Sequence, residues 1–131
     1  MDVSQFETLS DLLSFRQTSL FMKLTSRMSE LGKMGRTQYQ ILMREVSDTI
    51  QDLAMAYGER LMIEACINFL ANVKSDANKK IMESVFRIFA IDAVKRELGF
   101  YLINGAVSQV AAKSLVETQK VLIRETSKNI N

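Results

Sequence analysis

Proline is absent from this chain of 131 residues, and only five residues are glycine. Proline breaks helices and marks loops, so its absence removes the usual interruptions of a long helix. A β-sandwich would need many turn signals, and this sequence does not supply them. The length fits one domain that can bury its own core. The sequence therefore predicts an all-α fold in a single domain, residues 1–131, with long helices and few breaks.

The spacing of apolar residues predicts four helices. Apolar side chains recur mostly every three, four or seven residues, which places them on one face of each helix. The expected helices span residues 6–31, 38–73, 77–103 and 109–128. Short connections favour antiparallel neighbours, so we expect an up-and-down antiparallel four-helix bundle.

Capping residues mark the expected breaks between these helices. Gly32 and Gly35 suit the end of the first helix, and Gly105 suits the end of the third, because glycine adopts the left-handed conformation at little cost. Each break is followed by a side-chain oxygen that can accept a hydrogen bond from the first turn of the next helix. The expected N-caps are Thr37, Ser75 or Asp76, and Ser108.

The second helix is expected to present one continuous face to the core. Gly58 lies in its middle, where glycine costs roughly 1 kcal/mol relative to alanine, and we expect a neighbouring helix to pack closely there. Residues 61–70 are apolar on most sides, which predicts a central or partner-covered position. The expected core-facing residues are Ile41, Leu42, Val46, Ile50, Leu53, Tyr57, Leu61 and Ala65.

The composition excludes several kinds of chemistry. Histidine is absent from the sequence, which excludes Ser-His and Cys-His catalytic pairs and nearly all zinc sites within the chain. The formal net charge of +2 lacks the basic excess of a dedicated nucleic-acid binder. No apolar run reaches the length of a membrane span. We therefore expect neither a nucleic-acid partner, nor a metal, nor a transmembrane segment.

Two clusters of charged side chains are candidate sites. Glu45, Asp48 and Asp52 share a helical face, where carboxylates can exchange protons or bind a metal. We interpret them as a solvated face, because no nitrogen ligand accompanies them. A basic row near the C-terminus could meet phosphate, but cations at a helix C-terminus are also favourable on dipole grounds alone. Its members are Lys120, Arg124 and Lys128.

The sulfur-containing residues allow two interpretations. Cys66 is the only cysteine, so no disulfide can form within the chain, and its apolar neighbours favour an inert buried thiol. The eight methionines either fill the core or form an adaptable binding surface. We favour the core. If the chain is a piece of a larger protein, however, some methionines must be exposed where other domains dock.

The segment from Phe86 to Ser108 resembles a characteristic stretch of acyl-CoA oxidases. In that family a helix with an apolar-aromatic start leads to an acidic-Leu-Gly-aromatic step, a turn containing glycine and a serine-capped helix. Here residues 97–102 (Glu-Leu-Gly-Phe-Tyr-Leu) match the step, and residues 104–108 (Asn-Gly-Ala-Val-Ser) match the turn. The preceding alanine-rich helix also fits. The residues expected to support the fold or an interface are Phe89, Leu98, Gly99, Phe100, Tyr101, Gly105 and Ser108.

Three residues of this motif have specific expected roles. Gly99 would let another backbone or ring approach closely, because it has no side chain. Phe100 and Tyr101 would pack, and the Tyr101 hydroxyl would donate a hydrogen bond. These roles are structural rather than catalytic.

The chain departs from the family pattern in three places. Gln109 stands where the family often has proline after the capping serine, and no histidine lies near Tyr57, where the family often has one. The sequence ends Asn129-Ile130-Asn131, which differs from the Ser-Lys-Leu type of peroxisomal signal. A peroxisomal location is therefore implied by the resemblance alone.

The resemblance implies part of a flavin enzyme of fatty-acid β-oxidation. Acyl-CoA oxidases convert acyl-CoA to trans-2-enoyl-CoA: a carboxylate base takes the α-proton, FAD takes the hydride, and oxygen reoxidises the flavin to give hydrogen peroxide. In the family the base, most FAD contacts and the acyl-CoA channel lie upstream of this helical region. The region completes the fold and helps to build a homodimer. We therefore expect a structural and dimerisation domain with no catalytic residue, which binds no FAD by itself.

Another class of function is also compatible with the sequence. A free-standing helical interaction module would bind a partner helix or self-associate through residues 61–70 and 85–91. An independent enzyme is disfavoured, because the sequence holds no glycine-rich phosphate loop and no catalytic constellation. Flavin-binding sequence upstream of Met1 would distinguish an oxidase domain from a free module.

Overall fold

The computed structural model describes residues 5–130, and all regular structure in that range is helical, which confirms the all-α prediction. No helix in the described range is long and apolar enough to cross a membrane. The elements are α1 (Phe6–Lys33), α2 (Gln38–Gln40), the π-helical turn η1 (Ile41–Glu45), α3 (Ser47–Asn72), α4 (Asp76–Arg96), α5 (Leu98–Ile103) and α6 (Gln109–Ile130).

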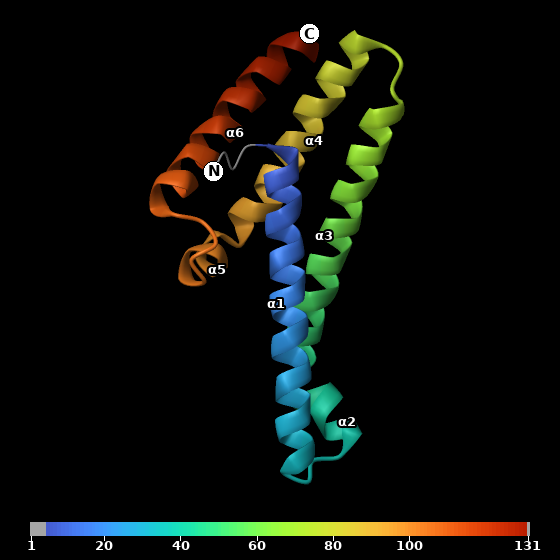
Figure 1. Cartoon of the computed structure of the whole chain (residues 1–131), viewed down its shortest axis with the longest axis vertical. Helices are drawn as coiled ribbons and strands as arrows, with labels where there is room; N and C mark the ends of the chain where they lie inside the picture. The colour runs from blue at the N-terminus through green and yellow to red at the C-terminus, as the bar shows by residue number, and fades with distance from the viewer. Residues whose placement is uncertain (1–4, 131) are drawn as a thin grey trace.

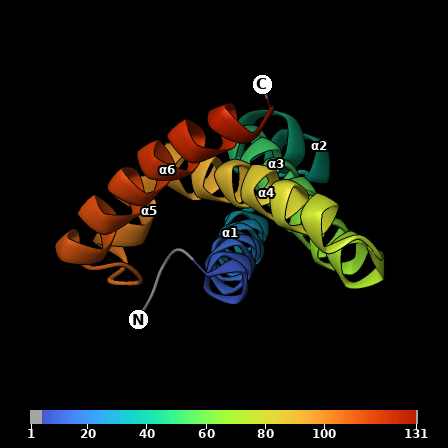
Figure 2. The same ribbon diagram turned by 90° about the horizontal axis from the view of Figure 1, so that it is seen from above.

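The four long helices alternate in direction along the chain. Figure 1 shows α1 running down, α3 up, α4 down and α6 up, as expected for an up-and-down arrangement. α4 is central to the packing because it contacts α1, α3 and α6. α6 packs mainly against α4, and the view from above in Figure 2 shows these two helices side by side.

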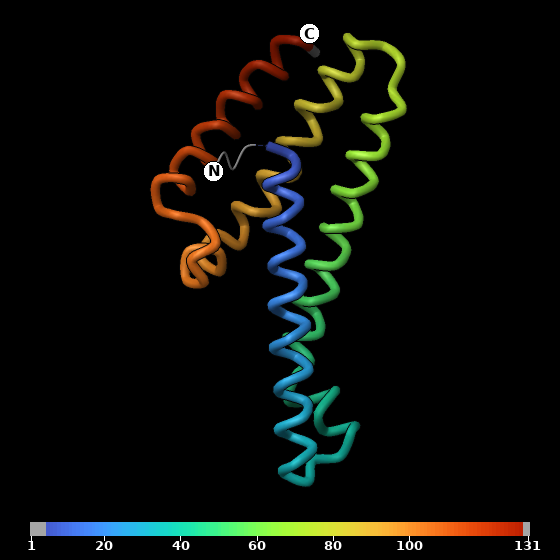
Figure 3. Tube along the Cα trace, viewed as in Figure 1, coloured from blue at the N-terminus to red at the C-terminus, as the bar shows by residue number. Residues whose placement is uncertain are grey.

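The lower part of the molecule is thinner than the upper part. In Figures 1 and 3, the lower turns of α1 and α3 extend past α4, α5 and α6, accompanied only by the short α2 region. We call residues 24–53 the stalk and the remaining described residues the bundle. The two regions have separate hydrophobic cores.

The bundle core draws on every long helix. Its fully buried side chains include Leu9 and Leu13 of α1, Ile63 of α3, Ile91 of α4 and Leu115 of α6. The stalk core is much smaller. Its four buried residues are Leu24, Leu31, Ile41 and Val46, with Met28, Ile50 and Leu53 packed around them.

The expected helix 38–73 is interrupted near its start. In η1 the Val46 N–H donates to the Ile41 carbonyl, 3.1 Å away, and Val46 then leaves helical geometry with φ −123°. Five residues correspond to about 140° around an α-helix, so a regular helix would point Ile41 and Val46 in different directions. The wider π-turn lets both side chains enter the stalk core.

The expected core face of α3 is wrong beyond Leu53. Tyr57, Leu61 and Ala65 are exposed. The buried apolar positions recur every seven residues instead, because that spacing stays in line with the neighbouring helices over several turns. These positions are Ala56, Ile63 and Leu70.

The expected helix 77–103 is two helices. α4 ends at Arg96, and Glu97 adopts φ −115° and ψ 28° before α5 begins at Leu98. The side chain of Glu97 reaches Arg16 on α1, with an oxygen 3.3 Å from the guanidinium. The break therefore falls at a residue that is held by a contact from another helix.

The predicted caps are confirmed. Thr37 accepts a hydrogen bond from the Gln40 N–H in a capping box, and Ser75 accepts one from the Asn78 N–H. The Ser108 hydroxyl accepts one from the Ala111 N–H at 3.1 Å, which caps α6. Gly35 and Gly105 have φ of +82° and +69° and close the ends of α1 and α5.

Candidate functional site

A buried ion pair joins α1 to α3 inside the bundle. Arg16 is 5% exposed and Glu59 is 8% exposed, and a guanidinium nitrogen lies 3.5 Å from the Glu59 Oε2. Charged groups so far from water are costly unless they are paired. This pair is therefore the most constrained polar feature of the described chain.

Further charges extend the pair into a network over three helices and the α4–α5 break. Arg96 at the end of α4 lies 3.3 Å from the Glu59 Oε1, and also 3.3 Å from a carboxylate oxygen of Asp92. Glu97 lies 3.3 Å from a second guanidinium nitrogen of Arg16. Each buried charge thus has at least one opposite charge beside it, and α1, α3 and α4 are held in one arrangement.

Tyr101 of α5 lies close enough to this network for its charges to act on the phenol. It is fully buried, and its hydroxyl has no hydrogen-bond partner among the described residues, contrary to the expected donation. Burial raises the pKa of the Tyr101 phenol above its ordinary value, while the Arg16 guanidinium opposes that rise and the carboxylates of Glu59 and Glu97 add to it. The phenol is thus held neutral, which suits a packing role rather than proton transfer.

The charge network was not predicted, although the sequence carries a signal for it. Arg16 follows Leu12 and Leu13 by four and three residues, and Leu20 follows it by four, so it occupies a core position of α1. Glu59 lies between Ala56 and Ile63 in the same way. Two opposite charges at core positions of neighbouring helices indicate a buried pair.

The family motif residues from Leu98 to Ser108 lie at the α4–α5–α6 corner, whereas Phe89 lies seven residues before the end of α4. Phe89, Leu98 and Phe100 are half-buried and pack against the bundle core. Phe100 meets Tyr101 edge to face at 5.4 Å and Phe15 of α1 at 6.0 Å between ring centroids. Gly105 and Ser108 form the turn into α6, as described above.

Two predictions about glycines are wrong within this chain. At Gly99 and at Gly58, a Cβ atom would meet nothing within 4 Å apart from each glycine's chain neighbours and its own helix backbone. No element of the described chain therefore packs closely at either position. Both glycines leave open space on the surface.

Both charged clusters singled out in the sequence are exposed. Glu45, Asp48 and Asp52 are exposed, and residues 5–130 hold no group of acids or cysteine arranged to bind a metal. The basic row of α6 is exposed as well, and Lys120 pairs with Glu117 at 3.3 Å. The carboxylates fit the interpretation of a solvated face, and the basic row lies in the C-terminal half of α6, where the helix dipole favours cations.

Cys66 is half-buried, and desolvation by burial raises the pKa of its thiol. A raised pKa lowers the fraction of reactive thiolate at neutral pH. This direction agrees with the prediction of an inert thiol.

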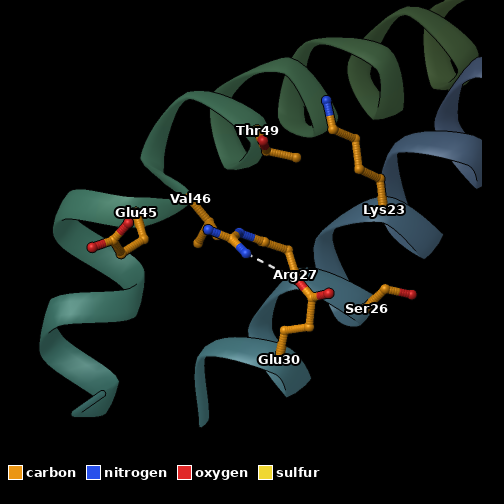
Figure 4. A pocket seen from close by; sticks show the side chains of 7 residues that line it. All are labelled: Lys23, Ser26, Arg27, Glu30, Glu45, Val46 and Thr49. Carbon is orange, nitrogen blue, oxygen red and sulfur yellow. Dashed lines mark hydrogen bonds and ion pairs between the residues drawn. The ribbon is translucent and has the colours of Figure 1, made fainter. Parts of the chain in front are cut away.

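The stalk contains a polar pocket of about 430 Å³ between α1 and the η1–α3 junction (Figure 4). Arg27 and Glu30 pair across 2.9 Å within its wall. The lining includes as many carboxylates as basic groups, so it has no strong preference for an anion or a cation. Its lining residues are Lys23, Ser26, Arg27, Glu30, Glu45, Val46 and Thr49.

Two more hollows lie at the ends of the bundle. One of about 310 Å³ is mostly apolar and lies at the α3–α4 corner, beside the edge-to-face pair Phe69–Phe86. The other, of about 580 Å³, lies between α1 and the α5–α6 turn and includes Asp11, Phe15 and Gly105.

The surface carries many large apolar side chains. The interpretation of the methionines as core residues is wrong for most of those described: Met22, Met34, Met43, Met55 and Met62 are all more than half exposed. Scattered apolar residues are normal on a surface, but contiguous groups mark interaction sites. Exposure of these methionines is what the alternative interpretation, an adaptable binding surface, requires.

The structure therefore defines a helical domain whose buried polar groups are structural and whose described surface is rich in apolar side chains. The family model for acyl-CoA oxidase matches residues 5–130, nearly the whole chain. The chain belongs to the acyl-CoA oxidase family. Neither the curated proteins nor the solved structures include a match to it.

Proposed function

We propose that this chain is the C-terminal structural domain of a FAD-dependent acyl-CoA oxidase, where it packs against the remaining domains and a second subunit. The observation that carries the proposal is the family match over residues 5–130 of a chain with many exposed apolar side chains. Those side chains would be covered by other parts of the enzyme. The reaction of the whole enzyme would convert acyl-CoA to trans-2-enoyl-CoA and hydrogen peroxide in fatty-acid β-oxidation.

The described residues do not fit a flavin site of their own. The polar pocket of the stalk sets two carboxylates beside its two basic groups, which disfavours a pyrophosphate, and the apolar hollow at the α3–α4 corner contains no basic side chain. We therefore place the FAD, the acyl-CoA channel and the catalytic carboxylate in other domains of the enzyme. The role of this chain is to support them.

The charge network around Arg16 and Glu59 fits a supporting domain. A buried pair contributes little net stability, but removing one partner is costly, so such pairs can fix a single arrangement of helices. Here that arrangement sets the angle between the α1–α3 pair and α4. A docking surface made of several helices needs this angle to be constant.

An immunoblot of source cells with an antibody against residues 107–130 tests the proposal. We expect a band several times heavier than the 14.9 kDa chain, which co-fractionates with flavin and with peroxide production that depends on acyl-CoA. A band at 14.9 kDa without flavin would contradict the proposal and favour a free-standing interaction module. The exposed apolar face of α3 is the observation that supports the module.

The same fractions test the cellular location. We propose a peroxisomal enzyme, because acyl-CoA oxidases typically occupy that compartment. The heavy band should sediment with catalase-containing particles. Its recovery in another fraction would leave the family intact and contradict the location.

A further inference from the structure

The hollow of about 580 Å³ in the bundle lies between one face of α1 and the α5–α6 turn. Four residues of α1, from Thr8 to Phe15, line it at the spacings i, i+3, i+4 and i+7, so they share one side of the helix. Residues 104–106 of the turn line its other side. We call this space the α1 hollow.

The segments that line the α1 hollow carry negative charge and no positive charge. Residues 5–15 and 98–112 contain no lysine or arginine, although the whole chain has 17 of them. Asp11 lines the hollow and forms no ion pair with another described residue. Glu7, one helical turn before Asp11, is exposed as well. The α1 hollow is therefore complementary to a cation.

The turn adds a neutral acceptor to the charge of Asp11. The side-chain nitrogen of Asn104 donates to the Phe100 carbonyl at 2.8 Å, which leaves the Asn104 Oδ1 as the free part of that amide. Gly105 beside it has no side chain, and a Cβ atom built there would meet nothing within 4 Å. This side of the hollow thus has room for an entering group and offers it an acceptor.

An aromatic ring lies next to the Asp11 carboxylate. Phe15 follows Asp11 by four residues, which sets their Cβ atoms roughly 5–6 Å apart on the helix surface. Phe15 is 39% exposed although its ring lies 6.0 Å from that of Phe100, so part of the ring remains accessible. A cation within about 6 Å of a ring centroid is attracted to the face of the ring. One cation can therefore meet the ring and the carboxylate together.

We infer that the α1 hollow binds an arginine side chain, which a segment of a partner inserts. The guanidinium stacks on Phe15 and donates hydrogen bonds to the Asp11 carboxylate and to the Asn104 Oδ1. Arginine suits these groups better than lysine, because its guanidinium is planar, is weakly hydrated and holds five donors in a fixed fork. The inference deepens the proposed function, on which it rests for the source of the segment, another domain of the same enzyme.

The surroundings of the α1 hollow select a polypeptide segment over a free small guanidine. Ile103 directly precedes the lining residues of the turn and is 87% exposed, and Val110 shortly after the turn is 79% exposed. Large exposed apolar side chains are typical of surfaces that contact another protein. The volume of about 580 Å³ also lies within the range of about 300–1,000 Å³ that holds whole drug-sized ligands. Residues that flank the arginine thus have room to enter with it.

Titration of the isotope-labelled 131-residue chain with acetyl-Leu-Arg-Leu-amide, followed by NMR, tests the inference. We expect chemical-shift changes that concentrate at residues 8–15 and 104–106, with a dissociation constant of about 1 mM, because so short a peptide buries little surface. The same peptide with citrulline, a neutral isostere of arginine, should bind at least roughly 10-fold more weakly. Absence of shift changes at these residues, or equal binding of the citrulline peptide, overturns the inference.

Two variants separate the contributions of the carboxylate and the ring. Asp11→Asn keeps the shape of the side chain and should weaken the arginine peptide at least about 5-fold, because the charge is lost. Phe15→Leu should weaken it about 3-fold. Asp48→Asn is the matched control: it removes the same charge from the exposed surface of the stalk and should leave binding unchanged. Circular dichroism checks that each variant is folded, and binding that is indifferent to Asp11→Asn overturns the inference.

Two further probes identify the occupant. Acetyl-Leu-Lys-Leu-amide should bind at least about 3-fold more weakly than the arginine peptide, because an ammonium is more strongly hydrated and cannot stack. Acetyl-arginine-amide, which lacks the flanking leucines, should also bind more weakly than the tripeptide. Equal binding of the lysine peptide overturns the choice of arginine, and equal binding of acetyl-arginine-amide overturns the choice of a segment over a free guanidine.

The two proposals fail separately. If the arginine peptide does not bind, a heavy, flavin-containing band on the immunoblot is unaffected, so the oxidase assignment would survive without this contact. A light band without flavin, together with arginine binding that depends on Asp11, would instead mean that the segment comes from a separate protein. In that case the arginine site survives and the oxidase assignment does not.

Discussion

The bundle and the stalk share two helices, yet they are held together differently. The bundle buries side chains from α1, α3, α4, α5 and α6 around the Arg16–Glu59 pair. The stalk buries four residues between α1 and the η1–α3 segment, and its described ion pair, Arg27–Glu30, is exposed. The difference shows that a long helix can be fixed at one end by tertiary packing and continue beyond it with much less support.

The largest expected effect on stability distinguishes the buried ion pair of the bundle from the exposed ion pair of the stalk. Arg16→Ala leaves Glu59 buried with only Arg96 beside it, so we expect the free energy of unfolding to fall by about 3–5 kcal/mol. Arg27→Ala in the stalk should cost less than about 1 kcal/mol, because its partner is solvated. Urea denaturation of both variants measures the difference. Equal losses would show that the buried pair does not distinguish the bundle from the stalk.

Removing a buried leucine side chain from each region is the next test of the difference between the bundle and the stalk. Leu115→Ala removes a fully buried side chain from the bundle and should lower the free energy of unfolding by about 3–5 kcal/mol. Leu31→Ala in the stalk should lower it by about 2 kcal/mol, because the surroundings of Leu31 can collapse more easily into the cavity. Hydrogen exchange shows where each loss falls. We expect Leu31→Ala to accelerate exchange mainly in residues 24–53. Acceleration throughout the bundle would mean that the two regions unfold as one unit.

The two left-handed glycines allow a comparison of the turns. Gly35 closes the stalk end of α1, and Gly105 closes α5 in the bundle, with φ of +82° and +69°. Replacing either with alanine should cost about 1–2 kcal/mol, because a Cβ is strained at positive φ. Since nothing crowds either position, the strain is purely conformational and the losses should be similar. A much larger loss for Gly105→Ala would indicate that the α5–α6 corner depends on more than its backbone angle.

The sequence predicted the parts of the fold that depend on local chemistry. The helix class, the capping by Thr37 and Ser108 and the turn at Gly105 were predictable, because each depends on a residue and its neighbours within one turn. The π-turn at Ile41–Glu45 was not, because it follows from which side chains enter the stalk core. The same holds for the buried face of α3. Its apolar residues surround the helix, so periodicity alone cannot select the face that packs.

The candidate site was predictable only in part. The motif residues from Phe89 to Ser108 were found because they resemble a known family, and those from Leu98 to Ser108 lie at one corner. The role expected of Gly99 was wrong within this chain, because close approach depends on which helix lies opposite. Arg16 and Glu59 were not predicted as a pair. Their significance depends on a contact between residues 43 positions apart.

The smallest expected effect at neutral pH concerns Tyr101 in the bundle. Its folded pKa is raised above the ordinary value near 10, so the folded state keeps the phenol neutral after the unfolded state has lost its proton. This difference between the folded and unfolded pKa of Tyr101 leaves the free energy of unfolding unchanged below pH 10 and lowers it as the pH rises above 10. At pH 11 the free energy of unfolding has fallen by roughly 1.4 kcal/mol. Tyr101→Phe removes both this alkaline loss and the unpaired buried hydroxyl. We expect it to change stability by less than about 1 kcal/mol at pH 7 and to be clearly stabilising relative to wild type at pH 11. Thermal unfolding of both proteins at the two pH values measures the difference. If Tyr101→Phe and the wild type differ in stability by the same amount at pH 7 and pH 11, Tyr101 reaches solvent in the folded state. The bundle around it would then be more open than the structure shows.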